Sequence, residues 1–184
     1  ARRIRNAVDQ GKQEYTDYAI FYRVNSLSRE LELALARHKI PYQLAGSVAF
    51  YERTEVKDLL SYLKLVNNPD DRVAFSRIVN KPLRGIGKTT QNKLIRWADE
   101  RGISLLEAAH QAADCPKLSK RAATMVARFA KMINGFSMAD SGSVAHLMEN
   151  IIDSTRMVDS WKESPDEADQ QRIANVNELL STAK

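Results

Sequence analysis

The chain has 184 residues, of which 43% are hydrophobic and 28% charged, a composition typical of a globular protein with one large or two small domains. No run of about 18 apolar residues occurs, which excludes a membrane-spanning helix, and the lack of a leader together with the single Cys115 predicts a cytoplasmic protein. The net charge of +5 is uneven, because residues 1–101 hold 19 Lys and Arg against 12 Asp and Glu, whereas residues 102–184 hold 9 against 11.

The first part of the chain alternates between predicted strands and helices. Tyr18–Val24 is aromatic and β-branched, which predicts a buried strand. Ser28 can cap a following helix, which is expected to end before Pro41 because proline disfavours helical geometry in the residue before it. Tyr42–Ala45 predicts a second short strand, and Thr54 begins a second helix. This alternation is typical of an α/β fold with parallel strands, and the remaining strands of the sheet are expected outside this chain.

After a break at Asn67–Asp70 the patterns become helical and strand signals stop. Gly102 fits a helix C-cap, and Ser104 and Ser143 fit N-caps. The predicted helices cover residues 71–79, 88–101, 104–113, 117–137, 143–154 and 167–182. A mainly α-helical second domain is therefore expected to begin near residue 70.

Between Asp71 and Asp99 the sequence contains no acidic residue. Seven cations lie in this interval: Arg72, Arg77, Lys81, Arg84, Lys88, Lys93 and Arg96. Such a local excess of positive charge suits a polyanion such as nucleic acid. A solvated basic face without a partner is the alternative, and the charge alone does not decide between the two.

The segment Arg84–Thr90 looks at first like a phosphate-binding P-loop. It lacks the pattern, since Pro82 stands where the P-loop has a glycine and the preceding residues predict a helix. Two helices joined by a tight Gly-x-Gly turn, a helix–hairpin–helix-like arrangement, fit the sequence better. In such a turn the glycines let a phosphate approach the backbone, and free amides at the start of the next helix donate to its oxygens.

The predicted DNA-binding residues belong to this turn and to the helix that follows it. They are Arg84, Gly85, Ile86, Gly87, Lys88, Thr89, Thr90 and Lys93. Contacts of this kind are independent of base sequence and weaken with salt. The alternative is a plain connection between two helices with an exposed basic rim. Because the glycine turn coincides with the acid-free interval, the sequence favours DNA contact.

Tyr22 and Arg23 close the first predicted strand, at the end where α/β folds place ligand sites. An arginine there can reach a nucleotide phosphate, and a tyrosine ring can stack on a base. Taken alone, roles in packing and at the surface are more common for such residues. His38, His110 and His146 lie far apart without the spacing typical of zinc ligands, so no metal site is expected.

Several segments together resemble the UvrD/PcrA/Rep helicases of superfamily one. The matching segments are Tyr22–Arg29, Ile40–Tyr42, Gly46 with Phe50–Asp58, Asn68–Asp71, Arg77–Asn80 and Pro82–Gly87. They share order and spacing over about residues 15–101, and jointly they are highly specific. Two positions depart from the family pattern: Ser47 replaces a second glycine, and Leu27 replaces a glutamine.

The resemblance implies a partial RecA-like motor domain followed by an inserted helical domain. Residues 1–70 would be the first part of motor domain 2A, and residues 71–184 would be domain 2B. Arg23 would contact the γ-phosphate of ATP, Tyr22 would stack near its base, and the turn at Arg84–Thr90 would touch duplex DNA. The parent enzyme would use ATP and Mg²⁺ for 3′-to-5′ movement in DNA repair or replication.

This chain by itself is expected to hold no bound cofactor and to hydrolyse no ATP. The segments that bind ATP across the cleft would lie in domains 1A and 1B and in the rest of 2A, which are its expected partners together with DNA. Its start at Ala1 rather than at a methionine suggests a piece of a longer protein. Two other functions fit the residues: a stand-alone DNA-binding module without sequence preference, and a scaffold that recruits other proteins. No membrane association is expected, and the parent would lie at the nucleoid.

Overall fold

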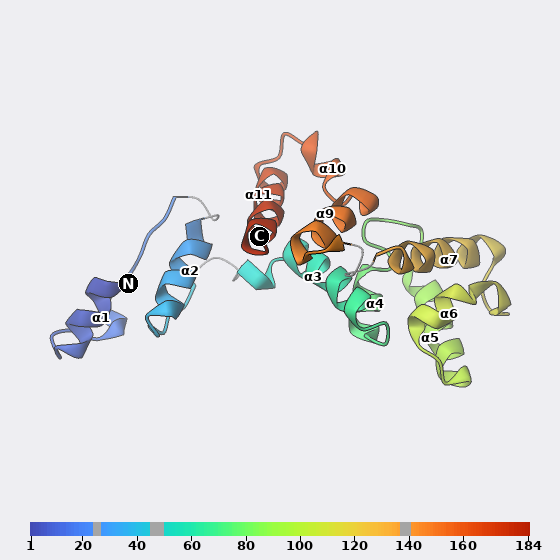
Figure 1. Ribbon diagram of the computed structural model, residues 1–184, viewed down its shortest axis with the longest axis horizontal. Helices are drawn as coiled ribbons and strands as arrows, with labels where there is room; N and C mark the ends of the chain where they lie inside the picture. The colour runs from blue at the N-terminus through green and yellow to red at the C-terminus, as the bar shows by residue number, and fades with distance from the viewer. Residues whose placement is uncertain (24–26, 45–49, 137–140) are drawn as a thin grey trace. The chain divides into compact units, whose positions relative to one another are not determined.

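Figure 1 shows the computed structural model, which describes residues 1–23, 27–44, 50–136 and 141–184. Within these ranges every regular element is a helix. The chain divides into two compact units, residues 1–53 and residues 54–184. The described part of the chain is therefore mainly helical, as predicted for the residues after the break at Asn67–Asp70.

The first unit consists of short helices joined by irregular segments. Its helices are α1 (Arg2–Asp9), a 3-10 helix at Tyr15–Asp17, α2 (Leu27–Arg37) and a 3-10 helix at Phe50–Glu52. Helix α2 is the one predicted after Ser28. The chain leaves it at Lys39, whose φ of 54° is left-handed, and the Ile40 amide donates to the Leu35 carbonyl at 3.0 Å. Pro41 follows directly, as its effect on helix ends predicts.

The two strands predicted in this unit are not formed in the described residues. Residues 18–23 and 41–44 have no regular structure, and Val24 and Ala45 lie outside the described ranges. The prediction of burial was also wrong, since Phe21 is 92% exposed. A strand requires backbone hydrogen bonds to a neighbouring strand, and in this unit these two segments do not pair in a ladder. The α/β part of the fold prediction is not confirmed.

The second unit is built around α3 (Thr54–Asn67). On its apolar side Val56, Leu59, Tyr62 and Leu65 are fully buried, and the helix contacts helices that follow it over a long stretch of the chain. These neighbours are α4 (Arg72–Ile78), α7 (Lys120–Asn134), α9 (Val144–Thr155) and α11 (Glu167–Thr182). The short α10 (Asp159–Lys162) packs on α11. By its contacts α3 thus belongs with the second unit, and the domain division near residue 70 stays a prediction.

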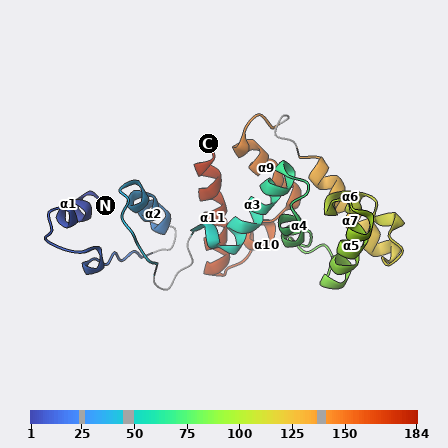
Figure 2. The same cartoon turned by 90° about the horizontal axis from the view of Figure 1, so that it is seen from below.

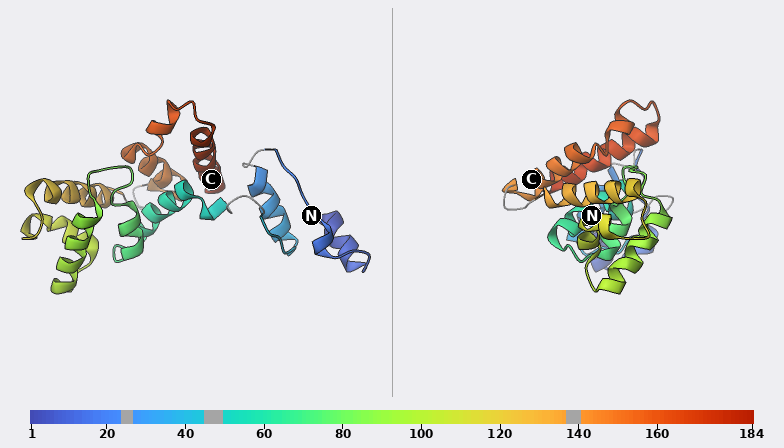
Figure 3. Two further views of the ribbon diagram at one scale, coloured as in Figure 1. Left: turned by 180° about the vertical axis from the view of Figure 1, so that it is seen from behind. Right: turned by 90° about the vertical axis from the view of Figure 1, so that its right-hand side faces the viewer.

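Helix α6 (Leu105–His110) packs against α7, and α5 (Lys88–Arg101) packs against α6, within the second unit (Figures 2 and 3). The 3-10 helix at Ala112–Asp114 connects α6 toward α7. The predicted caps are confirmed: Gly102 ends α5 with a φ of 64°, Ser104 accepts from the Glu107 amide, and Ser143 accepts from the His146 amide. These local signals explain why the predicted helices of this unit formed close to their expected bounds.

None of the helices in the described residues has the length and apolar character that crossing a membrane requires.

Candidate nucleic-acid interface

The connection from α4 to α5 is held in place by two amide side chains. Asn80 Oδ1 accepts from the backbone amides of Arg84 at 2.8 Å and Ile86 at 3.0 Å. On the other side Gln91 Nε2 donates to the Ile86 carbonyl at 3.0 Å, and the Ile86 side chain is fully buried. Both polar groups of the Ile86 backbone are thus bonded inside the protein. The turn is a braced structure, and the amide of Ile86 is not available to a ligand.

Arg84 points into the protein rather than toward solvent. Its Nη1 donates to the carbonyls of Ile78 at 3.0 Å and Lys81 at 2.8 Å, and its Nη2 donates to the Tyr62 hydroxyl at 2.6 Å. The guanidinium therefore donates to carbonyls at the end of α4 and just beyond it, and so ties the turn to that helix end. Burial raises the pKa of Tyr62, although the neighbouring Arg84 charge acts in the opposite direction. Of the predicted DNA-binding residues, Arg84 and Ile86 are the two that hold the turn.

At Gly85 and Gly87 the exposed side of the turn consists of backbone. Gly85 has a φ of 75°, which residues with a side chain rarely adopt, and both Gly85 and Gly87 are exposed with open space where a Cβ would stand. Gly87 is also the N-cap of α5 and offers no side chain to cap it. The amides at the start of α5 consequently face a region that a phosphate oxygen can reach.

The other large helices of this unit whose N-caps are described begin differently. Asp71 caps α4, Ser119 caps α7 and Asp166 caps α11, each by accepting a backbone hydrogen bond. No acidic residue lies in the first turn of α5, and Lys88 occupies its first position. A cation there is disfavoured by the helix dipole by about 0.3–1 kcal/mol, a cost that a bound anion would offset.

The seven cations of the acid-free interval are not equivalent. Asp58 pairs with Arg77 at 2.6 Å and with Lys81 at 3.1 Å, and Asp99 pairs with Arg72 at 2.6 Å. The expectation of seven cations without counter-charge was therefore wrong, because folding brings carboxylates from outside the interval back to it. With Arg84 bonded to carbonyls, the remaining cations are Lys88, Lys93 and Arg96, which make no ion pair among the described residues.

These three cations share the exposed side of α5. At about 100° per residue, Arg96 lies about 80° around the helix from Lys88 and about 60° from Lys93, so the three cations spread over one exposed arc of about 140°. The opposite side, with Leu94 and Trp97, is buried in the unit. Thr89 is exposed and Thr90 is half-buried in the same first turn. Arg96 was missed as a site residue, and its position between Lys88 and Lys93 on the helical wheel of α5 is the signal that could have found it. From Lys88 to Arg96 α5 extends about 12 Å.

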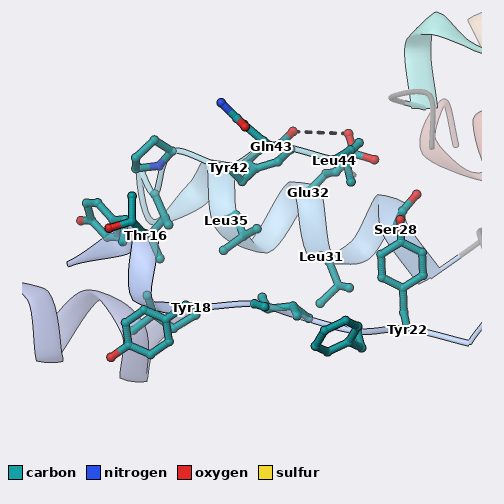
Figure 4. A pocket seen from close by; sticks show the side chains of 17 residues that line it. Thr16, Tyr18, Tyr22, Ser28, Leu31, Glu32, Leu35, Tyr42, Gln43 and Leu44 are labelled. Carbon is teal, nitrogen blue, oxygen red and sulfur yellow. Dashed lines mark hydrogen bonds between the residues drawn. The ribbon is translucent and has the colours of Figure 1, made fainter. Parts of the chain in front are cut away.

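In the first unit, Tyr22 and Arg23 have different surroundings. Tyr22 is half-buried and lines a hollow of about 830 Å³, together with residues of α2 and of the segment around Tyr42. Figure 4 shows Leu31 and Leu35 of α2 directed toward the segment that carries Tyr22. Arg23 is exposed and does not line the hollow. The structure thus places one of the two predicted nucleotide-binding residues at a hollow and the other at the surface.

The same unit holds two arginines in its interior that belong to the matched motifs. Arg53 donates to Ser28 Oγ at 2.8 Å and lies 5.4 Å from the Phe50 ring centroid. Arg29 lies 4.5 Å from the Tyr51 ring centroid and donates to its hydroxyl at 2.5 Å. These arginines join α2 to the 3-10 helix at Phe50–Glu52. In the described ranges no three His, Cys, Asp or Glu side chains gather closely enough to hold a metal ion.

Comparison with known proteins finds that this chain is similar to part of several DNA helicases. The family model described as UvrD-like helicase C-terminal domain matches residues 1–184. The ATP-dependent DNA helicase PcrA of Bacillus subtilis is 38% identical over 185 residues, which cover 100% of this chain and 25% of that protein. DNA helicase II of Haemophilus influenzae is 36% identical over 186 residues, covering 100% of this chain and 25% of that protein. The ATP-dependent DNA helicase Rep of Salmonella typhimurium is 40% identical over 173 residues, covering 92% and 26%. The chain spans about a quarter of the length of these relatives.

Proposed function

Because the chain belongs to the UvrD-like helicase C-terminal domain family, we propose that it is part of an ATP-dependent DNA helicase in which its second unit contacts duplex DNA. The observation that carries this proposal is the turn between α4 and α5. It offers two exposed glycines and a helix start without a side-chain cap, beside three cations that make no ion pair with any residue the structure describes. Contacts of this kind bind the phosphate backbone of DNA without reading its sequence.

Within this proposal the residues of the turn divide into two roles. Gly85, Gly87, Lys88, Thr89 and Lys93 make the contact, with the amides at the start of α5 donating to phosphate oxygens. Arg84 and Ile86 act indirectly, by holding the turn in shape. Arg96 extends the contact along α5. The strand in contact thus meets a preformed surface, which keeps the ordering cost of binding low.

The first unit would contribute to the ATP cleft of the parent enzyme, as part of an α/β motor domain 2A completed by other segments of the protein. Arg23 is exposed and free to reach a γ-phosphate presented from domain 1A. Tyr22 would stack near the base. ATP with Mg²⁺ would bind between the motor domains, and its hydrolysis would drive 3′-to-5′ movement in repair or replication. This chain alone would bind DNA without hydrolysing ATP.

Titration of the chain with a labelled duplex carrying a single-stranded overhang, at about 50 and about 200 mM salt, tests the DNA contact. We expect binding that weakens steeply with salt. The double variant Lys88→Glu/Lys93→Glu should bind at least about tenfold more weakly, because it loses two phosphate contacts. Each lost contact should also reduce the slope of log K against log salt by about 0.9.

The matched control is Lys120→Glu/Arg121→Glu, which makes the same charge change in the first turn of α7. Both of those side chains are exposed in the same unit, and α7 is capped by Ser119. The control should bind nearly as well as the unaltered chain. Equal loss in the two double variants would mean that only net charge matters. Absence of any salt-sensitive binding would favour a protein-recruiting scaffold and overturn the proposal.

A further inference from the structure

The loop between α4 and α5 presents one large apolar side chain to solvent. Leu83 is 90% exposed. A single exposed leucine is ordinary on a protein surface, so exposure alone implies no function. The position of Leu83 on the braced turn is what distinguishes it. Val73, which is 80% exposed on α4, is an example of an exposed apolar residue outside this turn.

Exposure alternates along the six residues of Pro82–Gly87. Ile86 is buried, and Pro82 and Arg84 are half-buried, whereas Leu83, Gly85 and Gly87 are exposed. The outward side of the segment therefore consists of two glycines and one leucine. A ligand that approaches the backbone at the glycines meets a single side chain on that side, and it is apolar.

Leu83 is also held between fixed neighbours. Arg84 Nη1 donates to the Pro82 carbonyl at 3.3 Å, and the Arg84 amide donates to Asn80 Oδ1 at 2.8 Å. The backbone on both sides of Leu83 is thus bonded to the unit. Little backbone freedom remains to be lost on binding, so an apolar contact made by this side chain would add to affinity with a small entropic cost.

We propose that Leu83 contacts sugars and base edges in the minor groove of the DNA whose phosphates bind at Gly85, Gly87 and the start of α5. This inference rests on the proposed DNA contact. Apolar side chains of this type pack into the minor groove beside backbone contacts in DNA-binding proteins. Four residues separate Leu83 from Gly87, at most about 14 Å of extended chain, so one duplex can meet both. The exposed cations Lys88, Lys93 and Arg96 on α5 favour DNA over an apolar protein partner as the occupant.

The salt dependence of binding separates an apolar contact from a phosphate contact. Leu83→Ala should raise the Kd for a labelled duplex about fivefold at every salt concentration, because it removes buried apolar surface. It should leave the slope of log K against log salt unchanged, since no counterion is released by an apolar contact. Lys88→Gln should instead reduce that slope by about 0.9. Val73→Ala is the matched control and should change neither quantity.

The outcomes distinguish this inference from the proposal on which it rests. If the unaltered chain shows no salt-sensitive duplex binding, both are overturned. If the chain binds, and Lys88→Glu/Lys93→Glu weakens binding while Leu83→Ala binds like the unaltered chain, the inference about Leu83 alone is overturned. A smaller salt slope in Leu83→Ala would also overturn it, because the side chain would then act by positioning the cations. If Val73→Ala weakened duplex binding as much as Leu83→Ala does, any exposed apolar side chain would have the same effect. The specific contact proposed for Leu83 would then be contradicted.

Discussion

Arg84 and Lys88 lie four residues apart and carry the same charge, but the structure gives them opposite surroundings. The guanidinium of Arg84 bonds to carbonyls and to the Tyr62 hydroxyl, whereas Lys88 is exposed at the start of α5. The sequence predicts both as DNA-binding cations because both belong to the glycine turn, which coincides with the acid-free interval. The planar fork of arginine can satisfy several carbonyls at once, which a lysine ammonium cannot do in the same geometry.

Arg84→Lys is therefore expected to cost stability although it conserves charge. It removes charge-assisted hydrogen bonds, most of them part-buried, and we expect a loss of about 1–3 kcal/mol in the free energy of unfolding. Urea denaturation followed by circular dichroism measures this change. Lys88→Gln is the comparison and should remain within about 0.5 kcal/mol of the unaltered chain, because its side chain is exposed. A stability loss in Lys88→Gln equal to that of Arg84→Lys would contradict the division of roles.

Also at the scale of residues, the sequence predicted which residues lie at the turn. It did not predict which of them are exposed and can contact a ligand. Gly85 and Gly87 were identified from their spacing alone, since few other residues permit such a turn. The pairing of Arg77 and Lys81 with Asp58 depends on the packing of α3 against α4, a contact across about twenty residues. No local pattern encodes such a contact, so the number of unpaired cations was overestimated.

At the scale of elements, helices were predicted well and strands were not, and the physical reason is locality. The hydrogen bonds of a helix and its caps lie within a few residues, so Ser104 and Gly102 mark their helix ends whatever lies elsewhere. The segment around Phe21 has the composition of a strand, but a strand forms only where a neighbour supplies hydrogen bonds. Within the described residues of its unit, no such neighbour is paired with it.

Contact between distant elements also depends on a buried polar pair that joins α11 to the start of α3. Asn175 Nδ2 donates to Glu55 Oε1 at 2.5 Å, and both side chains are buried. Asn175→Ala is expected to destabilise the unit by about 1–3 kcal/mol, because a buried carboxylate oxygen loses a donor. Asn177→Ala, at an exposed position of the same helix, is the control and should change stability by less than about 0.5 kcal/mol. Thermal melts of both variants test this, and equal melting temperatures would refute the role of the pair.

At the scale of the whole molecule, the order and spacing of the motifs predicted the family, and that prediction is confirmed. The motifs identify the family because they are defined by the order and spacing of residues along the sequence. They do not predict which residues will contact the motif residues in the folded protein. The nucleotide-binding roles of Tyr22 and Arg23 stay predictions. This chain spans about a quarter of the length of its relatives, and the other segments that would hold ATP lie in the remaining three quarters. A test of those roles requires the full-length enzyme.

In the full-length helicase the two units should fail in different ways when altered. Lys88→Glu/Lys93→Glu is expected to reduce duplex unwinding at least about tenfold through lost phosphate contacts, while ATP hydrolysis stimulated by single-stranded DNA stays within about twofold. Arg23→Ala should instead lower ATP hydrolysis by about 10³-fold, the size typical of an arginine that stabilises a transferring phosphoryl group, and unwinding should fall with it.

Paired assays of unwinding and ATP hydrolysis on the same preparations measure both effects, with Lys120→Glu/Arg121→Glu as the charge-matched control in the second unit. A loss of hydrolysis in Lys88→Glu/Lys93→Glu as large as its loss of unwinding would mean that the turn acts on the motor rather than on the duplex. Normal ATP hydrolysis in Arg23→Ala would show that Arg23 has no role in the ATP cleft. Its exposed side chain would then be an ordinary surface residue of the first unit.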